Sequence, residues 1–473
     1  MNINESPIIV GLDIGTTKIA VIAGRKNEYG KLEILGFGRS ESNGVQHGKV
    51  LNIDHTIKAI HQALKKCADN NPELEIGEVY VGIAGHHIKS IQTRGDLVRQ
   101  DPEVEIRRTE IETLINDQKK SFIPPGDEII EVIPQDYRVD NISNIKDPIG
   151  YIGVKVGANF HIITGDRNAI KNIKRAVERS SLTTKDLVLQ PLASASAVMS
   201  DQDMEAGVAI LDIGGGTSDL AIFHDGILKH TAVIPYGGEN ITNDIKVGLG
   251  VMKTQAEALK VQFGSALATE ANANAFITIP GLRGMPAKQI SVKNLAEIIQ
   301  ARMEEILDFV CFELKKVGLD SRSLNGGLII TGGGSQLKHL IQLSEYATGL
   351  NARIGYPNEH LAPNHLEELK APMYSTCIGL MLKGFNDHDN QVKRYYDANP
   401  QKFELIKKQR EAKVVEAPVS QVAAPETEPA EKEQKQKKAK VKAVPEIPKE
   451  PFWDKFKGRL IDLFKEEDDH VIK

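Results

Sequence analysis

The chain has 473 residues, of which 26% are charged, and a formal net charge of −5. This length can bury a large core and predicts more than one domain, and the weakly acidic balance argues against a nucleic-acid partner. The cysteines Cys67, Cys311 and Cys377 lack the spacing of a zinc site or a disulfide framework, which favours a reducing cytoplasm.

The N-terminal part predicts a strand meander followed by a helix and a buried strand. The opening MNINESPIIVGLDIG has no basic n-region and predicts a strand in place of a signal peptide. No run of about 18 or more apolar residues predicts a membrane span. Turn residues and apolar spacing predict strands over 8–14, 18–25 and 31–39, a helix over 53–67 and a strand over 79–84.

The same order of elements returns later in the chain, after an insertion. The insertion is predicted to be a small α+β unit, with helices over 107–122 and 166–180 and strands over 128–139 and 159–165. The repeat has strands over 207–213, 219–223 and 227–234, then a long helix around 241–263. This pattern predicts an internal duplication into layered α/β lobes.

The rest of the chain completes the second lobe and ends in a tail. We expect a loop over 265–289, a helix over 291–317, a strand, glycine turn and helix over 328–341, and a last core helix over 371–385. Beyond about residue 411, prolines within a Glu-, Lys-, Ala- and Val-rich stretch predict a disordered linker. Its basic run 435–442 adjoins Glu431 and Glu433, so a solvated linker is favoured over an address signal or a polyanion patch.

The first repeated turn has the groups that an anion site needs. Asp13 ends an apolar strand, where a carboxylate is costly without a purpose. Gly15 allows a tight turn whose backbone N–H groups can face an anion. Thr16, Thr17 and Lys18 add hydroxyl and ammonium donors that suit phosphate oxygens.

The second turn offers a similar set with less side-chain bulk: Asp212, Gly214, Gly215, Gly216 and Thr217. Two such turns across a cleft could clamp a polyphosphate, with Asp13 and Asp212 holding Mg²⁺ through water. A single Asp-x-Gly hairpin is an ordinary turn, but repetition in matching architecture favours the functional interpretation.

A third glycine segment strengthens the prediction of a nucleotide site. Gly332, Gly333 and Gly334 follow a buried strand and are expected to place bare backbone at a helix N-terminus, close to a ribose or phosphate. Their spacing matches neither a P-loop nor a Rossmann fingerprint.

In this order, the three motifs resemble those of the actin, Hsp70 and sugar-kinase ATPase superfamily, with QPLASASAV (190–198) and STCIGLMLKG (375–384) as its two connecting helices. The resemblance implies duplicated actin-like (ribonuclease H-like) α/β lobes around an ATP cleft. It implies that Glu257 and Lys260 border the nucleoside and that Gln190 positions water. A Gln cannot act as a general base, so hydrolysis should be slow; Gln190 could equally be a helix-start residue without chemistry.

Within that superfamily the chain most resembles the FtsA family of bacterial cell-division proteins, from residue 8 to about 384 and again at the C-terminal helix. The resemblance implies a protein that binds ATP, forms polymers with itself at the division septum and tethers FtsZ to the cytoplasmic side of the inner membrane. It places the FtsZ C-terminal tail on about 240–302, and self-association and later division proteins on the inserted subdomain.

The same resemblance gives the expected domain boundaries. They are 1–85, 166–205 and 365–388 for the first lobe, 86–165 for the insertion, 206–239 and 303–364 for the second lobe, 240–302 for its small subdomain, 389–450 for the linker and 451–466 for a membrane-targeting helix.

The C-terminal helix is expected to bind an anionic membrane surface. At helical spacing its large apolar side chains fall on one face: Phe452, Trp453, Phe456, Leu460, Leu463 and Phe464. Docking in a protein groove is the alternative. A small-molecule kinase or an Hsp70-like ATPase would share the clamp, but a kinase needs no disordered tether and an Hsp70-like protein would carry a β-rich domain after the ATPase.

Overall fold

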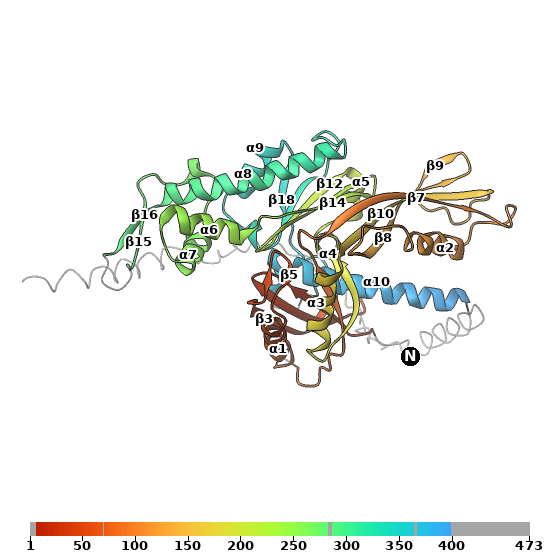
Figure 1. The fold of residues 1–473 in the computed structure, drawn as a ribbon, viewed down its shortest axis with the longest axis horizontal. Coiled ribbons are helices and arrows are strands. Elements are labelled where there is room, and N and C mark those ends of the chain that lie inside the picture. The colour runs from red at the N-terminus through yellow and green to blue at the C-terminus, as the bar shows by residue number, and fades with distance from the viewer. Residues whose placement is uncertain (1–5, 70, 282–285, 364–366, 399–473) are drawn as a thin grey trace, which may run out of the picture. The chain divides into compact units, whose positions relative to one another are not determined.

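The structure is a computed structural model that describes residues 6–69, 71–281, 286–363 and 367–398 (Figure 1). The predicted membrane helix over 451–466 and the linker beyond Ala398 lie outside these residues. Within the described part of the chain, no helix is both long and apolar enough to span a bilayer.

The first lobe is built on a five-stranded sheet of order β11-β6-β1-β2-β3. Its strands β1 (Ile9–Ile14), β2 (Lys18–Lys26) and β3 (Leu32–Glu41) form the predicted antiparallel meander. Strands β6 (Glu78–Ile83) and β11 (Thr183–Leu189) extend the sheet in parallel from β1. Because helices cover the sheet, its central strands are almost continuously apolar.

The second lobe repeats this topology, which confirms the predicted duplication. Its sheet has the order β14-β13-β12-β17-β18, again a meander followed by two parallel strands. The strands are β12 (Val208–Ile213), β13 (Ser218–His224), β14 (Ile227–Ile234), β17 (Gly327–Thr331) and β18 (Ala352–Ile354).

Two helices pack against each other between the sheets and against apolar residues of both lobes. They are α4 (Gln190–Val198) and α10 (Ser375–Ala398). They approach so closely that a Cβ at Gly379 would lie 1.8 Å from the carbonyl oxygen of Ala193. The helix predicted over 371–385 thus begins after a short 3₁₀ turn (η4, Pro372–Tyr374) and continues to Ala398, into the stretch assigned to the linker.

The insertion follows β6 and has a four-stranded antiparallel sheet of order β7-β10-β8-β9 with its own core. Its elements are β7 (Lys89–Val98), α2 (Arg108–Gln118), β8 (Asp127–Val139), β9 (Ile142–Ile145) and β10 (Lys155–Asp166). The chain returns to the first lobe through α3 (Arg167–Glu178), whose N-cap Asp166 accepts a hydrogen bond from the N–H of Ala169. Figure 1 shows α10 passing beneath α2, and Arg394 and Glu112 form an ion pair of 3.1 Å there.

The small subdomain of the second lobe corrects two predictions. The single helix expected over 241–263 is two helices, α6 (Gly238–Leu249) and α7 (Lys253–Phe263), because Gly250 adopts a left-handed conformation (φ 59°) that ends α6. The loop expected over 265–289 contains a strand, β15 (Phe276–Ile279), that pairs with β16 (Lys288–Ser291). The long helix α8 (Val292–Lys316) then returns as predicted, with Ser291 as its N-cap.

The remaining elements are α1 (Ile53–Asp69), which covers β3, the short strands β4 (Val45–Gln46) and β5 (Lys49–Val50), α5 (Asp201–Ala206), the 3₁₀ turns η1 (Ala268–Glu270), η2 (Gly333–Gln336) and η3 (Glu367–Lys370), and α9 (Leu340–Thr348).

Candidate functional site

The two repeated turns have the same backbone. Gly15 donates its N–H to the carbonyl oxygen of Lys18 at 3.0 Å, and Gly214 donates its N–H to that of Thr217 at 2.9 Å. A Cβ added at Gly15 would lie 2.9 Å from the oxygen of Lys18, and a Cβ added at Gly214 would lie 3.0 Å from the oxygen of Thr217, both closer than an ordinary van der Waals contact. The turns therefore require glycine at this position for the same steric reason.

The two turns meet each other directly. A Cβ at Gly215 would lie 2.4 Å from Cγ2 of Thr17, and a Cβ at Gly216 would lie 2.5 Å from Oγ1 of Thr16. The β4–β5 loop closes over them, because Gly48 donates its N–H to Oγ1 of Thr16 at 3.3 Å and Nδ1 of His47 lies 3.2 Å from the carbonyl oxygen of Gly216. Bare backbone in the second turn is what lets the first turn approach.

A cavity of about 90 Å³ lies between the turns. Most of the predicted site residues line it: Asp13, Gly15, Thr16, Thr17, Lys18, Gln190, Asp212, Gly214, Gly215, Gly216, Thr217, Gly332 and Gly333. Cavities that hold whole small-molecule ligands have roughly 300–1,000 Å³. The cavity is smaller than this because the two turns lie close together.

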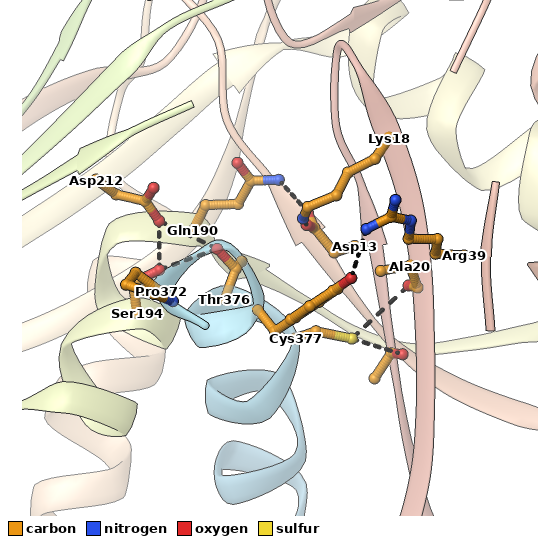
Figure 2. Close-up of polar contacts among 12 residues, drawn as sticks. Asp13, Lys18, Ala20, Arg39, Gln190, Ser194, Asp212, Pro372, Thr376 and Cys377 are labelled. Carbon is orange, nitrogen blue, oxygen red and sulfur yellow. Dashed lines mark hydrogen bonds and ion pairs between the residues drawn. The ribbon is translucent and has the colours of Figure 1, made fainter. Parts of the chain in front are cut away.

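In the first turn the carboxylate is neutralised. Lys18 Nζ lies 3.1 Å from Oδ2 of Asp13, and Nε2 of Gln190 donates to Oδ1 at 3.0 Å (Figure 2). The ammonium of Lys18 also lies 5.4 Å from the ring centre of Tyr374, within the range of a cation–π contact. Gln190, the first residue of α4, is thus held against Asp13.

In the second turn the carboxylate has only neutral hydrogen-bond partners among the residues that the structure describes. Ser194 and Thr376 both donate their hydroxyls to Oδ2 of Asp212, at 2.5 Å and 3.1 Å (Figure 2). Burial raises the pKa of Asp212, although the hydrogen bond from Ser194 opposes this and nearby Asp13 adds to it. The two connecting helices, α4 and α10, therefore each donate one hydroxyl to the same aspartate.

Asp219 also lines the cavity, and the sequence analysis did not single it out. It is directly opposite Asp212 in the β12–β13 pair and only 3% exposed. Burial, reinforced by the charge of Asp212, raises its pKa well above the ordinary value. An acidic residue inside the apolar segment SDLAIFH was the available signal, the same one that marked Asp13. Gly48, Met373 and Thr376 likewise line the cavity without having been predicted.

The third glycine segment divides into different roles. Gly332 has a positive φ of 83°, and a Cβ there would lie 2.3 Å from Oδ1 of Asp212. A Cβ at Gly333 would meet nothing within 4 Å, whereas Gly334 packs against Ile213 and does not line the cavity. Gly332 is the N-cap of η2, and Gly333 and Gly334 are its first two residues, so the predicted helix N-terminus is that of a 3₁₀ helix; α9 begins only at Leu340.

Glu257 and Lys260, on α7, do not line the cavity. They are linked to each other at 2.8 Å, and Lys260 Nζ donates to the carbonyl oxygen of Gly238 at 2.9 Å. The N–H of Gly238 in turn donates to the carbonyl oxygen of Gly214 at 2.9 Å. The pair therefore lies behind the second turn and supports the start of α6.

The donor set of the cleft fits a hard cation. Carboxylate oxygens, hydroxyls and backbone groups suit Mg²⁺, which usually takes one or two carboxylates and completes its shell with water and phosphate. Within the described residues, no group of three His, Cys, Asp or Glu side chains is placed to hold an ion directly. A buried carboxylate oxygen without a partner, Oδ1 of Asp219, is nevertheless present.

Family models match two parts of the chain. The model of cell division protein FtsA matches residues 209–379, and that of the SHS2 domain inserted in FtsA matches residues 85–164, which coincide with the inserted sheet.

Characterised relatives match along most of the chain. It is 37% identical to cell division protein FtsA of Neisseria meningitidis over 370 residues, 78% of this chain and 88% of the relative. It is 34% identical to that of Pseudomonas aeruginosa over 81% of this chain and 90% of the relative, and 33% identical to that of Escherichia coli K12 over 82% and 92%.

Among solved structures, a chain described as the PilM–PilN type IV pilus biogenesis complex aligns with a TM-score of 0.58 and 14% identity, covering 80% of this chain and 98% of that one. This likeness concerns the fold alone. Together with the repeated sheets, it agrees with the predicted duplicated actin-like lobes.

Proposed function

The chain belongs to the FtsA family of cell division proteins, and from that premise we propose that it binds ATP with Mg²⁺ between its two turns, polymerises on the cytoplasmic side of the inner membrane and anchors the FtsZ ring there. The observation that carries the ATP site is the cavity between the turns, which gathers groups from both lobes around one point.

In this proposal the two turns divide the work. Lys18 leaves Asp13 to meet phosphate oxygens, with Thr16 and Thr17 as further donors. The bare backbone of Gly215 and Gly216 offers N–H groups to the same phosphates. Asp13 and Asp212 hold the cation, which neutralises phosphate charge. Gln190 orients a water but takes no proton from it, so hydrolysis is at most slow.

ATP acts in this scheme as a conformational ligand. Because the turns belong to different lobes and already touch, a ligand that contacts both fixes their separation and favours one cleft geometry. Head-to-tail assembly requires subunits of one shape. We therefore propose that ATP promotes polymers, with FtsZ bound through its C-terminal tail to 240–302, and the insertion serving self-association and later division proteins.

The membrane contact is assigned to the C-terminal segment. At helical spacing, six of the seven large apolar side chains between Phe452 and Phe464 would fall on one face, and the segment between Phe452 and Lys465 has four basic and two acidic residues. A single such helix binds a membrane reversibly. A polymer carries many of them and binds by avidity.

One co-sedimentation experiment tests the whole proposal, using the full chain, ATP, vesicles with anionic lipid, and FtsZ. The wild type should carry FtsZ into the pellet only when ATP and vesicles are present. Gly333→Val should lose this ATP dependence, because its side chain enters space that the protein leaves open. Phe456→Glu should keep ATP binding and lose the vesicles.

The control is Gly77→Val, since a Cβ at Gly77 also meets nothing within 4 Å but lies away from the cleft. It should behave like the wild type. Wild-type ATP affinity in Gly333→Val would remove the nucleotide site from the proposal, and transfer of phosphate to a small metabolite would favour a kinase instead.

A further inference from the structure

Asp219 is a buried carboxylate whose hydrogen-bonding capacity is only half used. Oγ1 of Thr217 donates to its Oδ2 at 3.2 Å, whereas its Oδ1 is buried and has no partner. Buried polar groups are almost always paired, and a carboxylate oxygen left alone is costly. The residue lines the cavity between the turns, so the unpartnered oxygen belongs to the site and not to the distant core.

The hairpin architecture does not require a carboxylate at this position. Asp13 is opposite Ala20 in the β1–β2 pair, as Asp212 is opposite Asp219 in the β12–β13 pair. The two hairpins have the same length and the same turn hydrogen bond. Since the first forms with alanine here, the acid in the second has a role other than folding the hairpin.

The charges of the two hairpins are balanced differently. Both oxygens of Asp13 have partners, one of them the ammonium of Lys18. Asp212 and Asp219 receive hydrogen bonds from hydroxyls alone, and no ion pair reaches either of them from the part of the chain that the structure describes. Two adjacent buried carboxylates therefore lie at the cleft without a cation of the protein's own.

We propose that Asp219 is a cation-holding residue of the cleft: with Asp212, it takes the divalent cation that accompanies the polyphosphate, on the side of the second hairpin, and Asp13 meets that cation only through water. This rests on the proposed ATP site and deepens it. Two carboxylates, with water and phosphate oxygens, are a usual ligand set for Mg²⁺. The arrangement gives the phosphates an ammonium on one side and a metal ion on the other.

The test compares ATP affinity in excess Mg²⁺ with ATP affinity in EDTA, by fluorescence or calorimetry, on the full chain. The substitution Asp219→Asn keeps the shape and removes the charge. It should reduce the enhancement by Mg²⁺ at least tenfold and leave metal-free affinity equal or higher. Asp186→Asn is the matched control, because Asp186 is also an acid in a sheet, although only partly buried, and does not line the cavity; it should keep the wild-type enhancement.

The outcomes separate the two proposals. If the wild type binds no ATP, the proposed function fails. If the wild type shows an enhancement by Mg²⁺ and Asp219→Asn shows the same one, Asp219 is a neutral structural acid and the inference is overturned. Asp219→Ala, which copies the first hairpin, gives the same readout should Asp219→Asn not fold.

Discussion

The two hairpins at the cleft share a backbone and differ in chemistry. The first has threonines at its tip and pairs its aspartate with Lys18; the second has bare glycines at its tip and two adjacent aspartates that form no ion pair with any described residue. Duplication therefore preserved the turn and its internal hydrogen bond, while the side chains diverged. The difference teaches that a repeated motif is a repeated geometry whose side chains can differ in each copy; under the proposed function, each copy would take its own part of the ligand's charge.

The largest effect is expected where the two turns contact each other. Gly216→Val places a Cβ 2.5 Å from Oγ1 of Thr16 and 3.1 Å from backbone atoms of His47, with two further methyl groups beyond it. The turns should be forced apart in every state. ATP affinity, measured by equilibrium binding, should fall roughly a thousandfold or more, about 4 kcal/mol.

The position in the first hairpin that corresponds to Gly216 is Thr17, which is already β-branched. Thr17→Val keeps the shape and removes one hydroxyl, so it should reduce affinity only by the loss of one hydrogen bond, roughly tenfold or less. Equal effects of Gly216→Val and Thr17→Val would show that the two tips are chemically equivalent.

The repeated strands could be predicted from the sequence because apolar runs between turn residues have one simple solution. Strands β12 and β14 lie within a residue of their predicted ranges. Strand β7 was missed because it has the polar sequence KSIQTRGD and is largely exposed, so its partners in the sheet decide its conformation. The break after α6 was visible in Gly250 but was outweighed by the helical spacing around it.

The candidate site was predictable where its residues are contiguous. Both turns and Gly332 were found because glycine and acid mark a turn locally. Ser194 and Thr376 were beyond reach, since they are 18 and 164 residues from Asp212 and meet it only through the packing of α4 on α10. The positions of Glu257 and Lys260 behind the second turn depend on the α6–α7 angle, which no local pattern encodes.

The inserted subdomain has a buried histidine where it meets each lobe, and the two can be compared in the same way. His161 on β10 contacts Oγ1 of Thr231 on β14 at 3.0 Å, and His87 is buried just after β6. Burial lowers the pKa of each to about 4. In the unfolded chain each histidine takes up a proton near pH 6.5, whereas in the folded chain it stays neutral down to about pH 4. The free energy of unfolding is therefore highest above pH 6.5 and decreases as the pH falls towards 4.

For each histidine this amounts to about 2 kcal/mol between pH 7 and pH 5. We expect the free energy of unfolding, measured with urea, to fall by about 2 kcal/mol less between pH 7 and pH 5 in His161→Gln, and likewise in His87→Gln, than in the wild type. Hydrogen exchange should locate the effect, at β14 for His161 and at β6 for His87. An acid loss that persists unchanged in both variants would assign it to other groups.

The smallest and most direct comparison uses the matched positions Lys18 and Thr217. Lys18→Met leaves the carboxylate of Asp13, whose side chain is 7% exposed, without its cation. Removing one partner of a largely buried pair is destabilising, and with Lys18 partly in solvent we expect a loss of about 1–2 kcal/mol in the free energy of unfolding. Adding Asp13→Asn should restore most of that loss.

Thr217→Val removes the one side-chain hydrogen bond that Asp219 accepts within the described part of the chain. It should cost about 1 kcal/mol without Mg²⁺, and saturating Mg²⁺ should recover that loss if a cation meets the same carboxylate. Chemical unfolding with and without Mg²⁺ measures both effects. Lys18→Met removes a charge from the other hairpin, so Mg²⁺ should not restore the stability that this variant loses. If Mg²⁺ restored both variants equally, the cation would be shared between the hairpins.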